Sequence, residues 1–303
     1  MSMLIASTID EAVMALASGA RPIAGGSDLV VSARHGKAPL PDSLVAIDRI
    51  EALRTVEELD GMLTIGAGVS HHAIESHPVI GARWSALADA SALVGSPATR
   101  HVGTLGGNVM NGSPAMDTGA PLVVLGALAE LRSTRSVRRV TMDELWTGPG
   151  RTSAEPDELC TAIVLPARGA SSGSAYVRLE YRRAMEIAVV GAAASVTLAA
   201  DGTIGAIAVA LTAVAPVILA VTDLDQLAGL SVAEAAAAAG ALASEQARPI
   251  SDLRASDRYR RHCVGVMARR AVEAAARRAA GETIAIPVNR SLGIGSSNNG
   301  ASA

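Results

Sequence analysis

The stretch TRHVGTLGGNVMNGSPAMD at positions 99–117 is dense in Gly, Ser, Asn and Thr, and it contains the adjacent glycines Gly106 and Gly107. Few charges occur in it, although apolar segments lie on both sides. Long loops of this composition inside a compact domain are usually functional or disordered, and the apolar flanks favour a functional loop. We therefore expect residues 95–121 to form a binding loop.

A second glycine pair, Gly25-Gly26, stands in AGGSD at 24–28, ahead of a predicted helix over about 28–36 with Ser27 as its N-cap. Adjacent glycines let backbone N–H groups approach phosphate oxygens, and a helix that begins just after them adds partial positive charge. One such pair is often only a tight turn. Two pairs with small polar neighbours favour a diphosphate-binding site. In the second pair these neighbours are Thr104, Asn108 and Ser113.

Asp117 follows Asn108 by nine residues. A carboxylate at this position suits sugar or ribityl hydroxyls better than it suits phosphate. The alternative is an ordinary turn-forming aspartate, since the neighbouring residues also favour turns.

The sequence does not match the other common ligand-binding and catalytic motifs. The segment GAGVSH at 66–71 follows a predicted strand but has His in place of the third glycine of a Rossmann fingerprint. No Gly-Lys-Ser/Thr is present, so there is no P-loop, and GGSDL at 25–29 lacks the last glycine of a nucleophile elbow. The spacing of His71, His72 and His77 does not match the i, i+4 zinc pattern, which favours ordinary histidines.

The composition narrows the class of protein. Half of the 303 residues are apolar, 18% are charged and none is Phe, so a packed core built from aliphatic side chains is expected. The net charge of −3 gives no reason to expect nucleic acid as a partner. Cys160 and Cys263 are too few to hold an iron–sulfur cluster or a structural zinc. The N-terminal segment has no signal-peptide pattern, and we expect a cytoplasmic protein.

Residues 202–222 carry no charge and are numerous enough to cross a membrane. However, Asp201-Gly202 separates two apolar runs, 187–200 and 203–215, that are rich in β-branched residues. Asp-Gly is a favoured hairpin turn, so the sequence predicts two antiparallel strands and no membrane span.

The remaining elements are predicted from caps and periodicity. Capping boxes at Thr8–Glu11 and Ser231–Glu234 begin helices, and a last helix covers about 257–280 before Gly281. Arginines on that helix form either a docking surface or, more simply, a solvated face. The final segment, 282–303, is expected to be mobile. Strands are expected at 22–24, 44–47, 63–66, 123–131, 137–140 and 158–166.

With these motifs in place, the sequence resembles the FAD-binding medium subunit of molybdenum hydroxylases, the group of xanthine dehydrogenase and aerobic carbon monoxide dehydrogenase. The resemblance covers about residues 1–280 and departs from the family pattern at His101-Val102, where Asn-Arg is common, and at Glu186, where Asp is usual. The segments that carry it are PIAGGSDL at 22–29, TRHVGTLGGNVMNGSPAMD at 99–117, ELCTAIVLP at 158–166, YVRLEYRRAMEIAVV at 176–190 and YRRH at 259–262.

The resemblance implies an α+β protein: a two-part α/β FAD-binding domain, with parts at 1–55 and 56–168, and a C-terminal domain at 175–281 of a small antiparallel sheet with helices. It also implies the cofactor, FAD. The loop from Pro22 to Leu29 and the segment from Thr104 to Asn108 hold its diphosphate, and Asp117 holds the hydroxyls of the flavin chain. The residues expected to bind FAD are Pro22, Ile23, Ala24, Gly25, Gly26, Ser27, Asp28, Leu29, Val94, Thr104, Leu105, Gly106, Gly107, Asn108, Ser113, Asp117, Cys160 and Arg178.

The same resemblance implies partners, a small subunit with [2Fe–2S] clusters and a large molybdopterin subunit, assembled as a dimer of heterotrimers. Electrons pass from the clusters to the flavin and then to an external acceptor, so no catalytic side chain and no metal ligand is expected in this chain. Two alternatives stay open at this point: a stand-alone FAD-dependent reductase, and an assembly subunit that has lost its flavin.

Overall fold

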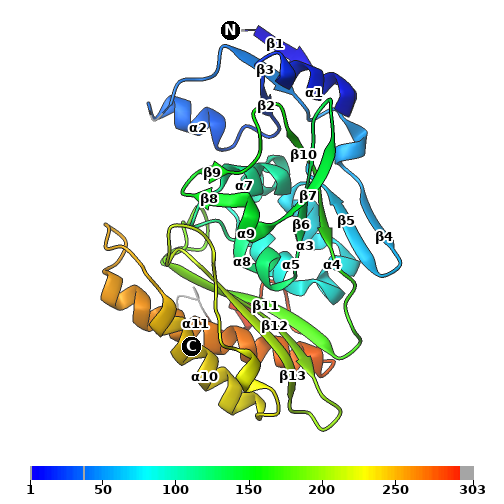
Figure 1. Cartoon of the computed structure of the whole chain (residues 1–303). Coiled ribbons are helices and arrows are strands. Elements are labelled where there is room, and N and C mark those ends of the chain that lie inside the picture. The colour runs from blue at the N-terminus through cyan, green and yellow to red at the C-terminus, as the bar shows by residue number, and fades with distance from the viewer. Residues whose placement is uncertain (1, 37, 294–303) are drawn as a thin grey trace, which may run out of the picture.

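The computed structural model describes residues 2–36 and 38–293. The chain folds into an N-terminal part and a C-terminal part that lie against each other, and the N-terminal part itself contains two sheets (Figure 1). Both parts contain helices as well as sheets, and one sheet is parallel while the others are antiparallel. The expected α+β class is therefore confirmed.

The first sheet is parallel and has the strand order β1-β3-β2. Helix α1 begins where predicted, because the Thr8 side chain accepts a hydrogen bond from the Glu11 N–H, and it buries Ala12, Val13 and Leu16. Strand β1 was not predicted, since its exposed residues show no burial pattern. The elements are β1 (Ser2–Ile5), α1 (Ile9–Ala17), β2 (Arg21–Ile23), α2 (Leu29–Arg34) and β3 (Ser43–Ala46).

The second sheet is antiparallel, with the order β4-β5-β10-β6-β7. Every residue of its central strand, β10, is buried. The strands and the short helix that precedes them are η1 (Glu51–Leu53), β4 (Val56–Leu59), β5 (Met62–Gly66), β6 (Leu128–Arg132), β7 (Val137–Thr141) and β10 (Leu159–Leu165).

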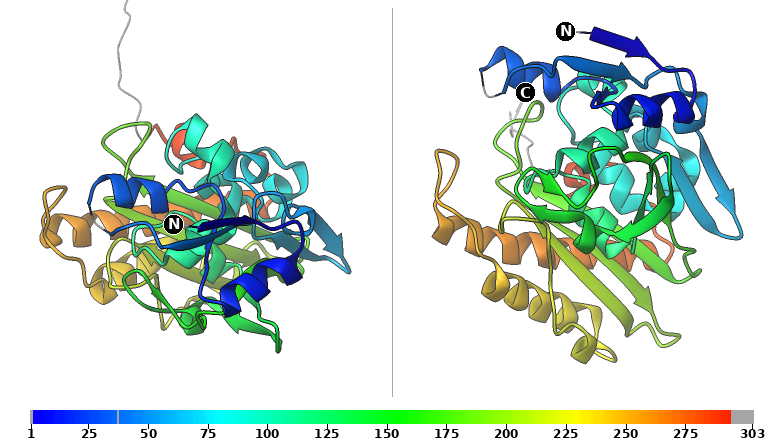
Figure 2. Two further views of the ribbon diagram at one scale, coloured as in Figure 1. Left: turned by 90° about the horizontal axis from the view of Figure 1, so that it is seen from above. Right: turned by 45° about the horizontal axis from the view of Figure 1, so that its top comes forward.

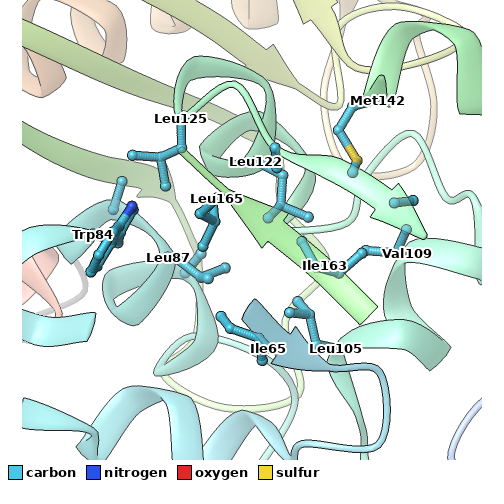
Figure 3. Close-up of a cluster of buried hydrophobic side chains, with 14 of the residues drawn as sticks. Ile65, Trp84, Leu87, Leu105, Val109, Leu122, Leu125, Met142, Ile163 and Leu165 are labelled. Atoms are coloured by element: carbon cyan, nitrogen blue, oxygen red, sulfur yellow. The ribbon is translucent and has the colours of Figure 1, made fainter. Parts of the chain in front are cut away.

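Short helices cover this sheet. Leu105 and Leu122 of these helices, and Trp84 between two of them, share one apolar core with Ile65 and Ile163 of the strands (Figure 3). The segment 95–121 was expected to be a loop, but it contains two helices and the first half of a third. These elements are α3 (His71–Ser76), α4 (Pro78–Arg83), α5 (Ser85–Ser91), α6 (Pro97–Val102), α7 (Leu105–Asn111), α8 (Gly119–Val124), α9 (Met142–Leu145) and the hairpin β8 (Trp146–Gly148) with β9 (Arg151–Thr152).

The strand expected over 123–131 is partly wrong, since Val123 and Val124 belong to α8 and the strand begins at Leu128. Its pairing with β7 is as predicted. The helix ends because Gly126 adopts a positive φ of 66°, which is the conformation that stops a helix and turns the chain.

The C-terminal part is an antiparallel sheet with the order β11-β12-β13-β14. Helices α10 and α11 lie side by side on one face, and α5 and α8 of the N-terminal part pack on the other (Figure 2). The elements are β11 (Ser172–Leu179), β12 (Val190–Leu198), β13 (Ile204–Thr212), β14 (Leu219–Ala220), η2 (Asp225–Leu227), α10 (Val232–Gln246) and α11 (Asp257–Ala279).

The predicted hairpin is therefore confirmed, and its lack of charge has a structural cause. Because helices cover both faces of β12, most of its residues are buried, as are the last residues of β13. Gly202 takes the positive φ of 84° that the turn needs, and the Asp201 carboxylate accepts a hydrogen bond from the Thr203 N–H at 3.0 Å. No helix within residues 2–36 and 38–293 is long and apolar enough to cross a membrane.

Residues 282–293, which belong to the segment expected to be mobile, make defined contacts with the rest of the chain. This segment contains α12 (Val288–Ser291), and the Val288 N–H donates to Asp89 Oδ1 at 2.9 Å. The Asn289 side chain accepts from the Arg178 N–H at 3.0 Å and donates to the Arg178 carbonyl at 2.8 Å. It therefore extends the pairing of β11. Residues 294–303, the rest of the predicted tail, lie outside the described residues.

Candidate cofactor-binding site

The first glycine pair lies between β2 and α2, in a loop that is open to solvent at Gly25 and Asp28. Gly26 has a φ of 67°, and a Cβ on Gly25 would lie 1.8 Å from the carbonyl oxygen of Val102. A side chain at Gly25 is therefore incompatible with this packing. The Ser27 side chain does not cap α2, contrary to expectation, because Asp28 is the residue that precedes the helix.

Within the described chain, the backbone N–H groups from Gly25 to Asp28 donate no hydrogen bond to another protein group. Four consecutive donors are thus free in a loop that glycine holds in an unusual conformation. Concave runs of backbone N–H groups of this kind bind phosphate oxygens. The residues present consequently fit a diphosphate, which is the group that the sequence predicts here.

The second glycine pair is not a loop but the first turn of α7. Thr104 is the N-cap of this helix, and its Oγ1 accepts from the Gly107 N–H at 3.1 Å. Gly106 donates its N–H to the Ala67 carbonyl at 2.8 Å, and a Cβ on Gly106 would lie 2.5 Å from the Ala67 Cβ. The N–H of Asn108 bonds to the Thr104 carbonyl. Gly106 is therefore required for packing, and the free donors belong to the first loop.

The two glycine motifs meet at Gly103. A Cβ built on Gly103 would lie 3.5 Å from Ser27 Oγ of the first loop and 3.5 Å from the His71 ring. A Cβ on Gly25 would lie 3.1 Å from the Gly103 nitrogen. Segments about eighty residues apart in sequence thus form one continuous surface, with Gly107 exposed at its edge.

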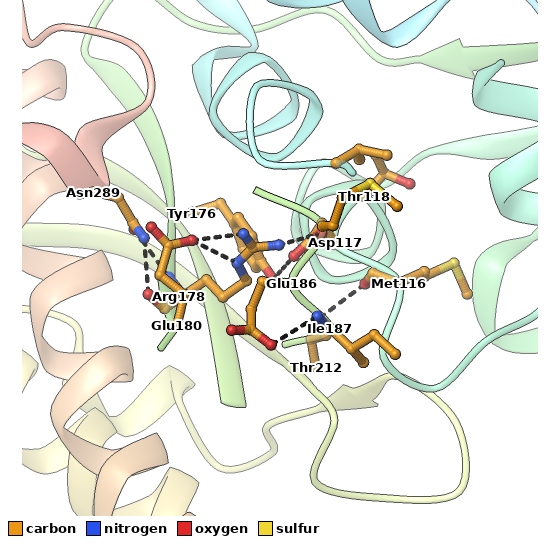
Figure 4. Close-up of polar contacts among 12 residues, drawn as sticks. Met116, Asp117, Thr118, Tyr176, Arg178, Glu180, Glu186, Ile187, Thr212 and Asn289 are labelled. Atoms are coloured by element: carbon orange, nitrogen blue, oxygen red, sulfur yellow. Dashed lines mark hydrogen bonds and ion pairs between the residues drawn. The ribbon is translucent and has the colours of Figure 1, made fainter. Parts of the chain in front are cut away.

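Asp117 and Arg178 also meet, in a different contact (Figure 4). Asp117 Oδ1 accepts from the Tyr176 hydroxyl at 2.8 Å, and Oδ2 accepts from Arg178 Nη1 at 2.7 Å. Arg178 is fully buried, and its guanidinium also donates to Glu180 Oε2 at 2.6 Å. The group joins the segment before α8 to strand β11, and hence the N-terminal part to the C-terminal part.

The charges of this buried group support one another. Burial raises the pKa of Asp117, while the Arg178 charge and the hydrogen bond from Tyr176 act in the opposite direction. Burial by itself lowers the pKa of Arg178, but the Asp117 and Glu180 carboxylates outweigh it and hold that pKa above its usual value. Arg178 is therefore a permanent cation, and it needs both carboxylates because an unpaired buried charge is strongly destabilising.

The other expected residues have separate environments. Cys160 lies in β10, where burial, with a contribution from the Glu130 carboxylate, raises the pKa of its thiol to about 12. The Val94 carbonyl accepts from Arg100 Nη1 at 3.2 Å, and Ser113 Oγ accepts from the Ala115 N–H at 3.3 Å. Because it is buried and protonated, the thiol of Cys160 is unreactive.

Sequence reasoning missed three residues of the surface around Gly103. Ala67 lies under Gly106, Val102 provides the carbonyl that Gly25 contacts, and His71 is buried beside both motifs. His71 had been grouped with His72 and His77 as an ordinary histidine. No local signal distinguishes it, because its burial depends on Gly103, which is distant in sequence.

The free N–H donors of the first loop and the adjoining glycine surface fit a ligand that contains a diphosphate. Residues 1–168 match the family described as "FAD binding domain in molybdopterin dehydrogenase", and residues 175–275 match "CO dehydrogenase flavoprotein C-terminal domain". The chain belongs to this family of FAD-binding subunits of molybdenum hydroxylases. Its cofactor is FAD, and it is an oxidoreductase component.

Individual relatives agree with this assignment. The carbon monoxide dehydrogenase medium chain of Afipia carboxidovorans is 34% identical over 266 residues, covering 87% of this chain and 91% of the relative. The xanthine dehydrogenase FAD-binding subunit of Escherichia coli is 30% identical over 287 residues, covering 91% and 96%.

Solved structures show the same fold. Carbon monoxide dehydrogenase from Oligotropha carboxidovorans superposes with a TM-score of 0.87 at 32% identity, over 92% of this chain and 98% of that chain. Quinoline 2-oxidoreductase from Pseudomonas putida 86 superposes with a TM-score of 0.85 at 26% identity, with the same coverage.

Proposed function

We propose that this chain is the electron-transfer flavoprotein of a molybdenum hydroxylase, which relays electrons from iron–sulfur clusters of a partner subunit to an external acceptor. The observation that supports it most is the run of four free N–H donors at Gly25–Asp28, held against Val102 by the absence of a side chain at Gly25. A diphosphate accepts hydrogen bonds from such donors.

The chain's own residues bind and position the cofactor. Donors from Gly25 to Asp28 hold the diphosphate, and the surface from Gly103 to Asn108 forms the adjoining wall. Asp117 stays in the proposal as a partner for the hydroxyls of the flavin chain, because each carboxylate oxygen accepts more than one hydrogen bond. When bound, FAD supplies the redox chemistry. Val94, Ser113, Cys160 and Arg178 complete the proposed set of cofactor-binding residues.

The partners proposed are a small subunit with [2Fe–2S] clusters and a large molybdopterin subunit, assembled as a dimer of heterotrimers in the cytoplasm. Two observations support this assembly. Its relatives include a carbon monoxide dehydrogenase medium chain and a nicotine 6-hydroxylase medium subunit, and the chain has two cysteines, too few to ligate a cluster of its own. We further propose the division into parts at 1–55, 56–168 and 175–281.

Expression of the chain with and without its genomic neighbours tests the proposal. The chain alone should bind one FAD, seen as protein-bound flavin absorbance after gel filtration, yet reduce no small acceptor from an organic substrate. Co-expressed neighbours with cluster and molybdopterin motifs should co-purify with it and transfer electrons to its flavin. Substrate turnover by the isolated chain would favour a stand-alone reductase. Failure to take up FAD under any condition would favour an assembly subunit.

A further inference from the structure

His71 is the first residue of α3 and is 1% exposed. Its backbone N–H donates to the Gly103 carbonyl at 3.1 Å, and its ring carbon Cδ2 lies 3.5 Å from the position that a Cβ on Gly103 would occupy. Ser27 Oγ is at the same distance from that position. The imidazole therefore lies at the place where the two glycine motifs meet.

The ring nitrogen Nδ1 of His71 is buried and has no hydrogen-bond partner among the described residues. Buried polar atoms in folded proteins nearly always have a partner, so an exception at a ligand-binding surface indicates a missing one. Burial, and secondarily the charge of Arg100, lowers the pKa of His71 to about 4. The ring is thus neutral near pH 7, with one N–H donor and one acceptor nitrogen.

The next residue shows what a histidine without such a role looks like on the same helix. His72 is exposed, its Nδ1 contacts Glu75 Oε1 at 3.0 Å, and its ring packs against that of His101 at an interplanar angle of 42°, with centroids 3.9 Å apart. All of its polar contacts are made on the surface. His71 and His72 therefore form a matched pair of adjacent histidines: His71 is buried with Nδ1 unpartnered, and His72 is exposed with Nδ1 bonded to Glu75.

We propose that the His71 imidazole binds FAD by donating a hydrogen bond to the diphosphate, beside the free N–H groups of Gly25–Asp28. A diphosphate oxygen is an anionic acceptor and needs donors on more than one side. The first loop supplies backbone donors from β2–α2, and His71 supplies a side-chain donor from α3. This inference rests on the proposed position of the diphosphate and adds a ligand group that the glycine motifs do not contain.

Equilibrium binding of FAD to the full-length apoprotein tests it. His71→Phe keeps the ring but removes both nitrogens, and it should weaken FAD binding about 10- to 100-fold, as expected for loss of a hydrogen bond to a charged group. His71→Gln restores a donor and should recover most of the affinity. The control His72→Phe should stay within about twofold of the wild type, since surface changes have small effects.

A second measurement does not depend on a variant that folds. In the wild-type chain labelled with ¹⁵N-histidine, the ring-nitrogen resonances of His71 should shift when FAD binds. Unchanged His71 resonances in a wild-type chain that binds FAD, or a His71→Phe variant that binds FAD as tightly as wild type, would overturn this inference alone. A wild-type chain that does not bind FAD would instead overturn the proposed function.

Discussion

Arg178 Nη1 lies 2.7 Å from Asp117 Oδ2, and this buried ion pair joins strand β11 to the segment before α8. The side chain of Arg178 is wholly buried and that of Asp117 is 8% exposed. Water therefore screens the pair little. A chain segment from the FAD-binding part is thus held to the C-terminal part by charge as well as by apolar packing.

Arg178→Met should lower the free energy of unfolding by about 3–5 kcal/mol, because Asp117 and Glu180 would be left as buried carboxylates without a cation. Urea denaturation followed by circular dichroism measures this. The control Arg269→Met removes an exposed pair with Glu273 and should cost less than about 1 kcal/mol. Equal losses for the two variants would contradict the structural role of Arg178.

Gly25→Ala should weaken FAD binding at least about tenfold, because the added Cβ forces the loop away from Val102 at a typical overpacking cost. Flavin fluorescence titration measures the dissociation constant. Gly169→Ala is the matched control, since a Cβ there would meet no atom within 4 Å. If Gly25→Ala bound FAD normally, the position of the first loop against α6 would be wrong.

Local chemistry explains which elements the sequence could predict. The capping residues Thr8 and Ser231 lie within four residues of the groups that they satisfy, and α1 and α10 begin where the sequence places them; the reciprocal capping box forms at Ser231, whereas at Thr8 the Glu11 side chain accepts from the Ser7 N–H. The hairpin around Gly202 was also predictable from a local turn. Helix α7 was not, because Gly106 and Gly107 make its first turn resemble a loop, and the contact with Ala67 that requires Gly106 comes from a distant strand connection.

In the candidate site, too, local motifs could be predicted from the sequence, whereas contacts between distant segments could not. The glycine motifs predicted a diphosphate site, and the resemblance pointed to Asp117 and Arg178 one at a time. Their direct contact spans 61 residues of sequence and depends on the packing of two sheets. Segment 282–293 was expected to be mobile because it leads into the GSSNNGASA end of the chain, yet Asn289 is buried against the backbone of Arg178.

Iodoacetamide should not label Cys160 in the native Cys263→Ala variant at pH 8. The thiolate is the reactive form, and a pKa of about 12 leaves only on the order of one thiol in ten thousand ionised at that pH. Mass spectrometry of the intact chain should show no adduct before denaturation and one adduct after it. Rapid native labelling would mean that β10 opens readily or that the thiol is not buried.

Acid should destabilise the chain through His71. Its pKa is lowered to about 4 in the fold, against 6.5 for an exposed histidine, so the unfolded chain binds more protons between these values. Stability from this group is therefore complete above pH 6.5 and is lost as the pH falls toward 4, by up to about 3 kcal/mol. Urea denaturation at pH 7 and pH 4.5 should show a smaller pH-dependent loss in His71→Phe than in the wild type. Equal pH dependence in the wild type and in His71→Phe would show that His71 is not buried as a neutral group.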